Sequence, residues 1–306
     1  MNRRDFLGAA VASAVAPTLP RRAHALEKAS ASDLPRSLGP SRPVTEQQRR
    51  IAEEVRYLGF DVFGSVVDWR GSVIAEVREL ARQRGWDLDP VEFAVAWRAN
   101  YGPSRNLVRS GELPWTDLDD LHRMTLDDLI GQFNLQGLAE EDKAHLNKVW
   151  HRLHPWPDAS SGLGRLKTRY VLSPMSNGNV ALLTEMAKFG GLPWDCVMGT
   201  DVVRHYKPDP EMYLAPCEFF DLEPSQVMLV AAHPGDLESA KSHGLHTAYV
   251  HRPLERGPDA EPWDPPEAGR FDFIAMDFHD LASQLGIWSY PNQPEIGTRT
   301  FGVQGR

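Results

Sequence analysis

Short apolar runs separated by amphipathic stretches fill the second half of the chain. The runs, typical of buried strands, occur at 170–173, 196–199, 227–231, 247–250 and 271–274. Stretches with helical spacing occur between and after them, at 179–189, 210–220, 236–243 and 278–285. This alternation predicts an α/β protein with a doubly wound parallel sheet and helices on both of its faces.

A first strand and turn are predicted earlier, at 59–67, and a long helical block follows them. Ser72 to Arg84 places Val73, Val77 and Leu80 on one helix face, and Asp89-Pro90 is a favourable helix start. Residues 117–133 and 140–153 are also amphipathic. Because no strand pattern occurs in 71–153, we expect an all-helical cap there, inserted into a core domain of 51–70 and 154–288.

The N-terminal residues resemble an export signal. Arg3-Arg4 precedes an apolar run, Leu7 to Ala16, and Ala23-His24-Ala25 offers small residues for cleavage. We therefore expect residues 1–25 to engage the twin-arginine export machinery and the protein to be periplasmic or otherwise exported. The alternative is a basic disordered tail. The apolar run is too short for a stable membrane span.

The segments next to the core are predicted to be irregular. Residues 26–50 are rich in Ser, Pro, Ala and charge and predict a linker, whereas 289–306 predict an irregular tail. Signal cleavage would remove a net charge of +3 and change the formal net charge from -9 to -12. Since no basic stripe interleaved with aromatic residues occurs, we expect no nucleic-acid partner.

Chemically active side chains follow successive predicted strands. They are Asp61 with Ser65, Ser176 with Asn177, Lys207 before a Pro-started helix, and His233 with Asp236. In open α/β sheets the loops after the strands form the active site. Each residue alone has another interpretation, because Asp and Ser favour turns and helix caps and Lys is usually solvated. Their shared placement favours an active site.

Taken together, these motifs resemble the haloacid dehalogenase superfamily, and within it the type II L-2-haloacid dehalogenases, from about Tyr57 to Leu285. The resemblance rests on the following residues: Asp61 with Asp68, Trp97-Arg98, Ser176-Asn177-Gly178, Lys207-Pro208-Asp209 with the downstream Tyr213, and Asp236. It implies the superfamily's Rossmann-like core and a helical cap. It also favours a homodimer.

The resemblance implies hydrolytic dehalogenation of short 2-haloalkanoic acids to 2-hydroxyacids, with inversion at C2. Asp61 would be the nucleophile that forms an ester, and Lys207 would keep it ionised. The remaining expected roles are halide stabilisation by Arg98, Asn177 and His233, carboxylate binding by Ser65 and Ser176, water positioning by Asp236 with His233, and support by Tyr213. No cofactor is expected.

Three residues depart from the pattern of the resembled enzymes. Ser65 stands where Thr is typical and keeps the hydroxyl group. Ala231 stands where Ser is common, and His233 stands where Asn is common. The last two substitutions bear on halide specificity and rate, and they leave the nucleophile unchanged.

Two further positions separate this chain from the superfamily's phosphatases. Phe63 occupies the place of a second Asp, and Ala232 occupies the place of a Mg²⁺ ligand. The remaining carboxylates supply a poor site for a hard cation, so we expect no metal. The alternatives are a phosphatase-like hydrolase, which these two residues disfavour, and a non-catalytic protein that binds small organic acids.

A few residues have no assigned chemistry. Cys196 and Cys217 lack metal-ligand spacing and are predicted to be thiols in or near the core. Trp97 and Tyr101 in the cap either exclude water from the site or belong to the core, and we favour the core.

Overall fold

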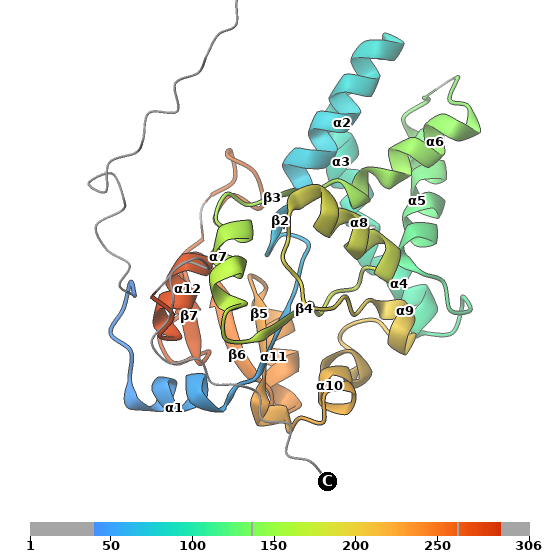
Figure 1. Cartoon of the computed structure of the whole chain (residues 1–306). Helices are drawn as coiled ribbons and strands as arrows, with labels where there is room; N and C mark the ends of the chain where they lie inside the picture. Colours follow the sequence, from blue (N-terminus) through green and yellow to red (C-terminus); the bar gives the residue numbers. More distant parts are fainter. Residues whose placement is uncertain (1–39, 136, 262, 289–306) are drawn as a thin grey trace, which may run out of the picture. The chain divides into compact units, whose positions relative to one another are not determined.

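The computed structural model of the chain describes residues 40–135, 137–261 and 263–288. The predicted signal (1–25), most of the predicted linker and the predicted tail (289–306) lie outside them. The main sheet has five strands: β1 (Tyr57–Phe60), β4 (Val171–Pro174), β5 (Val227–Ala231), β6 (His246–Val250) and β7 (Phe273–Ala275). All neighbouring strands are parallel, in the order β4-β1-β5-β6-β7 (Figure 1).

The strand order places a topological switch point at β1. Phe60 at the end of β1 pairs with Pro174 of β4 on one side and with Val230 of β5 on the other. The chain reaches β4 first and then crosses to the other side of β1 for β5. Crevices at the carboxyl ends of such strands hold the ligands of open α/β sheets. The predicted fold is confirmed. We therefore expect the ligand-binding crevice at the carboxyl ends of β1, β4 and β5.

Two hydrophobic clusters cover the two sheet faces. One contains Leu58, Phe60 and Val230 and packs on α1 (Glu46–Glu54), α7 (Ala159–Leu166), α8 (Val180–Gly190) and α12 (Phe278–Gln284). The other contains Tyr57, Leu229 and Tyr249 and packs on α10 (Pro210–Phe219) and α11 (Pro234–Ser242). Alternate strand residues therefore face opposite helix layers.

The segment after β1 is helical, as predicted. It contains α2 (Trp69–Arg84), α3 (Pro90–Ala99), α4 (Tyr101–Arg109), α5 (Leu118–Gln132), α6 (Glu140–Asn147) and the 3₁₀ turn η1 (Lys148–His151). Asp68, Asp89 and Asp117 cap α2, α3 and α5. The short antiparallel strands β2 (Val67–Asp68) and β3 (His154–Pro155) pair at the two ends of the insertion.

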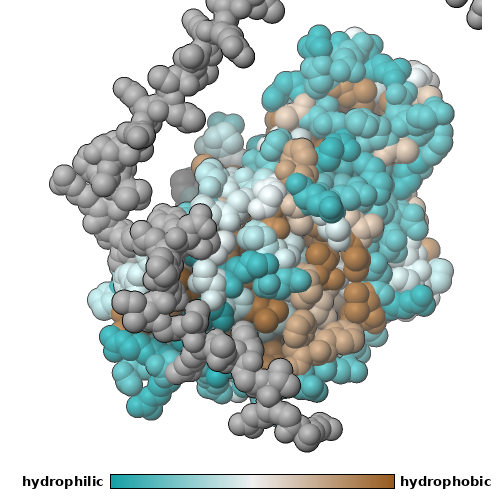
Figure 2. All heavy atoms as spheres, viewed as in Figure 1, coloured by the Kyte–Doolittle hydropathy of each residue, from teal (hydrophilic) through white to brown (hydrophobic). Residues whose placement is uncertain are grey.

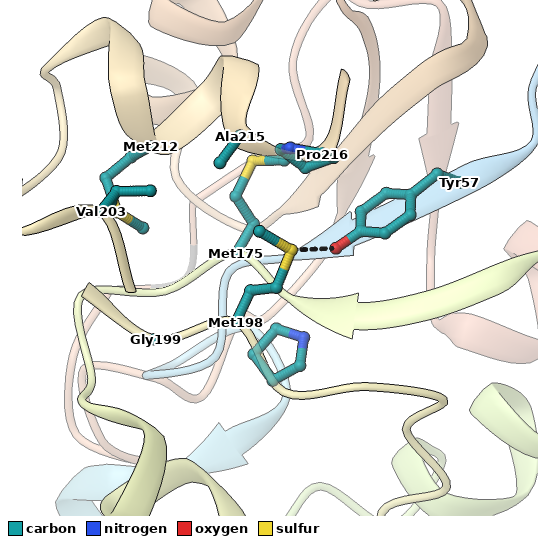
Figure 3. A pocket seen from close by; sticks show the side chains of 9 residues that line it. Tyr57, Met175, Met198, Gly199, Val203, Met212, Ala215 and Pro216 are labelled. Atoms are coloured by element: carbon teal, nitrogen blue, oxygen red, sulfur yellow. Dashed lines mark hydrogen bonds between the residues drawn. The ribbon is translucent and has the colours of Figure 1, made fainter. Parts of the chain in front are cut away.

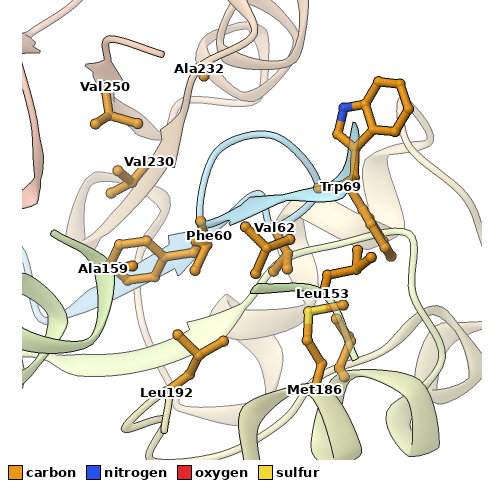
Figure 4. Packing of buried hydrophobic residues seen from close by; sticks show 14 of the residues in the cluster. Phe60, Val62, Trp69, Leu153, Ala159, Met186, Leu192, Val230, Ala232 and Val250 are labelled. Atoms are coloured by element: carbon orange, nitrogen blue, oxygen red, sulfur yellow. The ribbon is translucent and has the colours of Figure 1, made fainter. Parts of the chain in front are cut away.

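The insertion shares its core with the sheet. Phe93, Trp97 and Leu126 of the insertion belong to the same cluster as Phe60 and Val230 of the sheet. Figure 4 shows Trp69, Leu153 and Met186 beside Phe60 and Val62 in this cluster. The outer surface of α2 and α6 is mostly hydrophilic (Figure 2). Among the described helices, none combines the length and apolar composition that crossing a membrane requires.

Several predicted boundaries were wrong. The predicted linker (26–50) overlaps α1, which Thr45 and Gln48 cap reciprocally and which buries only Ile51 and Ala52. The run at 196–199 forms a single bridge, Met175 to Met198, instead of a strand. The predicted helix at 140–153 is α6 followed by the 3₁₀ turn η1. The helix α4 was missed because it buries no residue completely, and α7 was also missed. The short elements α9 (Thr200–Val203) and η2 (Pro224–Gln226) complete the described chain.

A small cavity lies beside the Met175–Met198 bridge (Figure 3). The Tyr57 hydroxyl group donates to the sulfur of Met198 at 3.4 Å, and burial raises the pKa of Tyr57. The remaining lining is mainly apolar: Pro174, Val203, Met212, Ala215 and Pro216. Cys196 and Cys217 are free thiols, as predicted, and lie partly buried against the hydrophobic cluster that contains Tyr57. We assign this region to packing, because it carries no group suited to catalysis.

Candidate active site

The carboxyl ends of β1 and β5 and the loop before α10 bring the predicted catalytic residues together. Asp61 directly follows β1, and its backbone N–H donates to the carbonyl oxygen of Val230 in β5 at 3.0 Å. Lys207 reaches both Asp61 and Asp236, which lies in the first turn of α11. His233, the N-cap of α11, contacts Asp61 from the other side. These contacts form a candidate active site around the Asp61 carboxylate.

The two oxygens of Asp61 have different environments. Oδ2 accepts hydrogen bonds from Ser65 Oγ at 2.6 Å and from His233 Nδ1 at 2.8 Å. Oδ1 lies 3.7 Å from Lys207 Nζ. Burial alone would raise the pKa of Asp61, but the charge of Lys207 and the hydrogen bond from His233 outweigh it and lower this pKa strongly. Asp61 is therefore ionised, with Oδ1 the less engaged oxygen.

Ser65 lies at the site, where its hydroxyl group links Asp61 to the backbone of Ala232. Its hydroxyl proton goes to Asp61, and its oxygen accepts from the backbone N–H of Ala232 at 2.9 Å. In this arrangement the hydroxyl group holds the carboxylate of Asp61, so it has no proton left for a substrate carboxylate. A carboxylate-binding role of Ser65 stays a prediction.

Lys207 is a buried cation shared by two carboxylates. Its Nζ donates to Asp236 Oδ2 at 2.5 Å, and Tyr213 donates its hydroxyl proton to Asp236 Oδ1 at 2.8 Å. Burial lowers the pKa of Lys207, but the charges of Asp236 and Asp61 outweigh it and raise this pKa. Burial and the charge of Asp61 raise the pKa of Asp236, because one cation serves two anions. Tyr213 thus contacts Asp236, and its supporting role stays a prediction.

His233 is held by a residue that the sequence did not indicate, Glu255. His233 Nε2 lies 2.9 Å and 3.1 Å from the two Glu255 oxygens, while its Nδ1 bonds to Asp61. Burial lowers the pKa of His233, but the hydrogen bonds to Asp61 and Glu255 outweigh it and raise this pKa to about 10. Since ionised carboxylates only accept hydrogen bonds, both ring nitrogens donate and His233 is an imidazolium.

The loop after β6 positions Glu255. Arg252 is buried in this loop, where its Nε donates to the carbonyl oxygen of Ser65 and its two terminal nitrogens bond to Asp158 at 2.8 and 2.9 Å. The indole N–H of Trp69 lies 3.4 Å from Glu255 Oε1. The signal that could have revealed Glu255 is its place in a loop that follows a parallel strand.

Gly64 leaves room for the Glu255 carboxylate. It has a φ of 91°, and a Cβ atom at this position would overlap Glu255 Oε1. Only glycine combines this left-handed backbone with so close an approach.

An alanine in a left-handed conformation costs about 1–2 kcal/mol. We expect Gly64→Ala to lower the free energy of unfolding by more than this amount. The excess would come from displacement of Glu255. Urea unfolding measures it against Gly85→Ala, because Gly85 has a φ of 67° and a Cβ atom there would meet no atom within 4 Å. Equal losses in the two variants would contradict the contact with Glu255.

The loop after β4 contributes Ser176 and Asn177. Asn177 donates from Nδ2 to the hydroxyl oxygen of Tyr101 at 3.0 Å and accepts the backbone N–H of Lys207 at 2.8 Å. Ser176 is fully buried, and its Oγ accepts a long hydrogen bond from Gly178 N–H. Among the described contacts, no hydrogen bond joins Ser176 to Asp61. The carboxylate-binding role of Ser176 stays a prediction.

Arg98 lies near Asn177 through Tyr101. Its guanidinium group stacks on the Tyr101 ring at 4.0 Å and lies 5.3 Å from the Trp69 ring. Its Nη1 is buried without a hydrogen-bond partner among the described residues, as are both ring nitrogens of His122 and the indole nitrogen of Trp150. Burial lowers the pKa of His122 to about 3, so this ring is neutral. The N–H groups of Arg98 and Trp150, which have no acceptor among the described residues and lie in an aromatic surrounding, suit an anion.

The two aromatic residues singled out in the cap have different positions. Trp97 is a core residue, as predicted, and donates its indole N–H to the carbonyl oxygen of His122. Tyr101 is half-buried: it packs against the core cluster, in line with the prediction, and also contacts Asn177. Arg105 of the same helix donates to the carbonyl oxygen of Lys207 at 2.9 Å. Helix α4 therefore faces the site.

The residues present offer few ligands for a metal ion. Phe63 and Ala232 are buried and supply no side-chain oxygen, and Lys207 lies between Asp61 and Asp236. In the described part of the chain, no group of three or more His, Cys, Asp or Glu side chains is arranged to hold a metal. The expectation of a metal-free and cofactor-free site stays a prediction.

Comparison with known proteins establishes the family. The family model of haloacid dehalogenase-like hydrolases matches residues 44–244. The chain belongs to this family of hydrolases, in agreement with the doubly wound sheet, the helical insertion and the Asp61 site.

Several proteins that are similar to this chain are 2-haloacid dehalogenases. One similar crystal structure is that of the L-2-haloacid dehalogenase PA0810. Its sequence is 45% identical to this chain, and the two structures align with a TM-score of 0.72 over 76% of this chain and 99% of that one. Another is the crystal structure of the defluorinating L-2-haloacid dehalogenase Rha0230. Its sequence is 42% identical to this chain, and the TM-score is 0.73 over 76% of this chain and 95% of that one. (S)-2-haloacid dehalogenase 1 of Pseudomonas sp. (strain CBS-3) is 28% identical over 65% of this chain and 86% of its own length.

Proposed function

We propose that the protein hydrolyses the carbon–halide bond of short 2-haloalkanoic acids and produces 2-hydroxyacids with inversion at C2. The observation that carries this proposal is the asymmetric environment of Asp61, whose Oδ2 accepts two short hydrogen bonds while Oδ1 lies only near the Lys207 cation. The names of the similar proteins support the same reaction.

In the first step Asp61 Oδ1 would attack C2 from the side opposite the halogen. A C–O bond forms, the carbon–halogen bond breaks, and the halide leaves with the electron pair, so the configuration at C2 inverts. Lys207 would keep Asp61 ionised before the attack. Ser176 and nearby backbone amides would hold the substrate carboxylate, with Ser65 holding the nucleophile.

The departing halide would be stabilised near Arg98 and Asn177. Arg98 has a buried N–H group without a partner in the described chain, and its guanidinium stacks on Tyr101, which bonds to Asn177. Preorganised donors of this kind stabilise charge that develops in a transition state. His233 was predicted to join this group, but its contacts with Asp61 and Glu255 favour a role in the second step.

In the second step water would cleave the ester at the carbonyl carbon of Asp61. Asp236 would orient this water, and Lys207 and Tyr213 fix the two oxygens of Asp236. The carboxylate of Asp61 is regenerated, and the product keeps the oxygen that attacked C2. An L-2-haloacid would thus give a D-2-hydroxyacid.

The two alternatives fit less well. A phosphatase of this fold needs a second Asp where Phe63 stands and a metal ligand where Ala232 stands. A protein that only binds organic acids does not require a buried Lys207 shared by two carboxylates, an arrangement that costs desolvation.

One assay separates the three functions. The purified protein is incubated with racemic 2-chloropropionate with and without EDTA, and with p-nitrophenyl phosphate and Mg²⁺. Chloride release that EDTA does not reduce, with D-lactate formed only from the L-enantiomer, is the expected result. Phosphate release alone would support the phosphatase, and saturable binding without turnover would support the binding protein.

We further propose that residues 1–25 direct export by the twin-arginine route, with the periplasm as the destination. The supporting observation is Arg3-Arg4 before the apolar run and the small residues up to Ala25. Replacing Arg3 and Arg4 together with Lys should reduce the exported fraction at least about tenfold, because this route reads the arginine pair as an address. Fractionation and immunoblotting measure it, and unchanged export would contradict the proposal.

A further inference from the structure

Glu255 has no role in the reaction as proposed so far, yet it is built into the site. It lies against the far nitrogen of His233, and its side chain is only 11% exposed. The same loop is anchored through buried Arg252 to the backbone of Ser65, and Gly64 provides the space that the Glu255 carboxylate occupies. These independent contacts fix Glu255 before any substrate binds.

The hydrogen bonds of Asp61 identify the oxygen that remains a carbonyl oxygen in the ester. If the less engaged Oδ1 attacks C2, then Oδ2 keeps its two donors, Ser65 Oγ and His233 Nδ1. Both donors also point at the position where negative charge develops when water adds to the ester. This is the geometry of an oxyanion hole.

Formation of the ester removes the charge of Asp61, one of the two anions that face His233. The other is Glu255, which bonds to Nε2 from the opposite side of the ring. Lys207 lies behind Asp61, and Arg256 lines the same cavity as His233. After esterification these two cations remain, so His233 depends on Glu255 to stay an imidazolium.

We propose that Glu255 is a positioning residue that keeps His233 protonated in the ester intermediate, so that His233 and Ser65 stabilise the oxyanion during hydrolysis. This inference rests on the proposed function. Because both ring nitrogens donate to carboxylates, His233 has no lone pair with which to activate water, and that task stays with Asp236.

Water oxygen bonds to the carbonyl carbon, and the electron pair of the C=O bond moves to Oδ2, where the Nδ1–H and Oγ–H groups bind it. Collapse breaks the bond between the carbonyl carbon and Oδ1, which leaves on the product. One water hydrogen ends on the product hydroxyl group, and the other is released as a proton when Asp61 returns to a carboxylate.

A cavity of about 390 Å³ borders the pair, lined by Trp69, Ala232, His233, Pro234, Glu255, Arg256 and Trp263. The side chain of His233 is 37% exposed. The imidazolium can therefore exchange its proton with solvent, so its protonation follows the bulk pH. Steady-state turnover should fall on the alkaline side as His233 loses its proton in the ester intermediate. This happens at a lower pH than in the free enzyme, because the charge of Asp61 is then gone.

The experiment compares Glu255→Gln with Glu261→Gln, which removes an exposed carboxylate from the same loop. Each variant and the unaltered protein are mixed with L-2-chloropropionate. Halide release in the first turnover, steady-state turnover and the mass of the Asp61 peptide are then measured. In Glu255→Gln we expect an unchanged rate of halide release in the first turnover, a steady-state rate lowered about 10²- to 10³-fold, and an ester that accumulates on Asp61.

The alkaline limb of the turnover profile should also shift to lower pH in Glu255→Gln, because His233 loses the anion that holds its proton. His233→Asn keeps an N–H donor without a charge and should likewise accumulate ester, with that limb absent. Glu261→Gln should match the unaltered protein. Absence of halide release by the unaltered protein would overturn the proposed function itself. Normal halide release with no ester accumulation in either Glu255→Gln or His233→Asn would overturn only the role of Glu255.

Discussion

Asp61→Asn is expected to lower steady-state halide release from 2-haloacids by about 10⁴-fold or more, the range seen when a nucleophile is removed. The amide retains the shape and can still accept hydrogen bonds from Ser65 and His233, but it lacks the charged oxygen that attacks C2. Halide electrode measurements with 2-chloropropionate and ester detection by mass spectrometry check the result.

The control for Asp61→Asn is Asp128→Asn, which changes an exposed carboxylate on α5. It should leave turnover unchanged. Far-ultraviolet circular dichroism establishes that both variants are folded. Turnover in folded Asp61→Asn within tenfold of the unaltered protein would exclude Asp61 as the nucleophile.

Lys207→Met is expected to remove turnover and also to destabilise the fold. Loss of the buried cation leaves Asp61 and Asp236 facing each other without compensation, which costs about 3–5 kcal/mol of unfolding free energy near neutral pH. The pKa of Asp236 is already raised, and without Lys207 it rises further. Since the folded variant then binds a proton more readily than the unfolded chain, lowering the pH stabilises it.

Urea unfolding at pH 8 and pH 5 measures this effect. The deficit of Lys207→Met relative to the unaltered protein should be larger at pH 8 than at pH 5. Lys188→Met, on the exposed side of α8, should change the unfolding free energy little at either pH. A deficit of Lys207→Met that does not depend on pH would mean that cavity formation, and not the unpaired carboxylates, causes the loss.

The sequence predicted those parts of the site that follow directly from strand order. Asp61, Asn177 and His233 lie one to three residues after the ends of parallel strands, and such strand ends meet at one edge of the sheet. Lys207 was placed correctly because a Pro-started helix follows its loop. The strands β5 and β6 were predicted within one residue because their apolar runs are continuous.

Other features depend on distances that the sequence does not contain. Glu255 reaches His233 only because the backbone at Gly64 leaves space and Arg252 anchors the loop. The proton of Ser65 goes to Asp61 because the turn after β1 folds back over four residues. Helix α4 was missed because its polar residues show no buried periodicity, although Tyr101 at its start faces the site.

The hydrophobic cluster that joins the insertion to the sheet has a thermodynamic consequence. Phe93 and Leu126 from the insertion share one continuous apolar interior with Val230 and Val250 from the sheet. Separating the two parts would transfer these side chains to water at about 25 cal/mol per Å² of apolar surface. We therefore expect the insertion and the sheet to melt as a single cooperative unit.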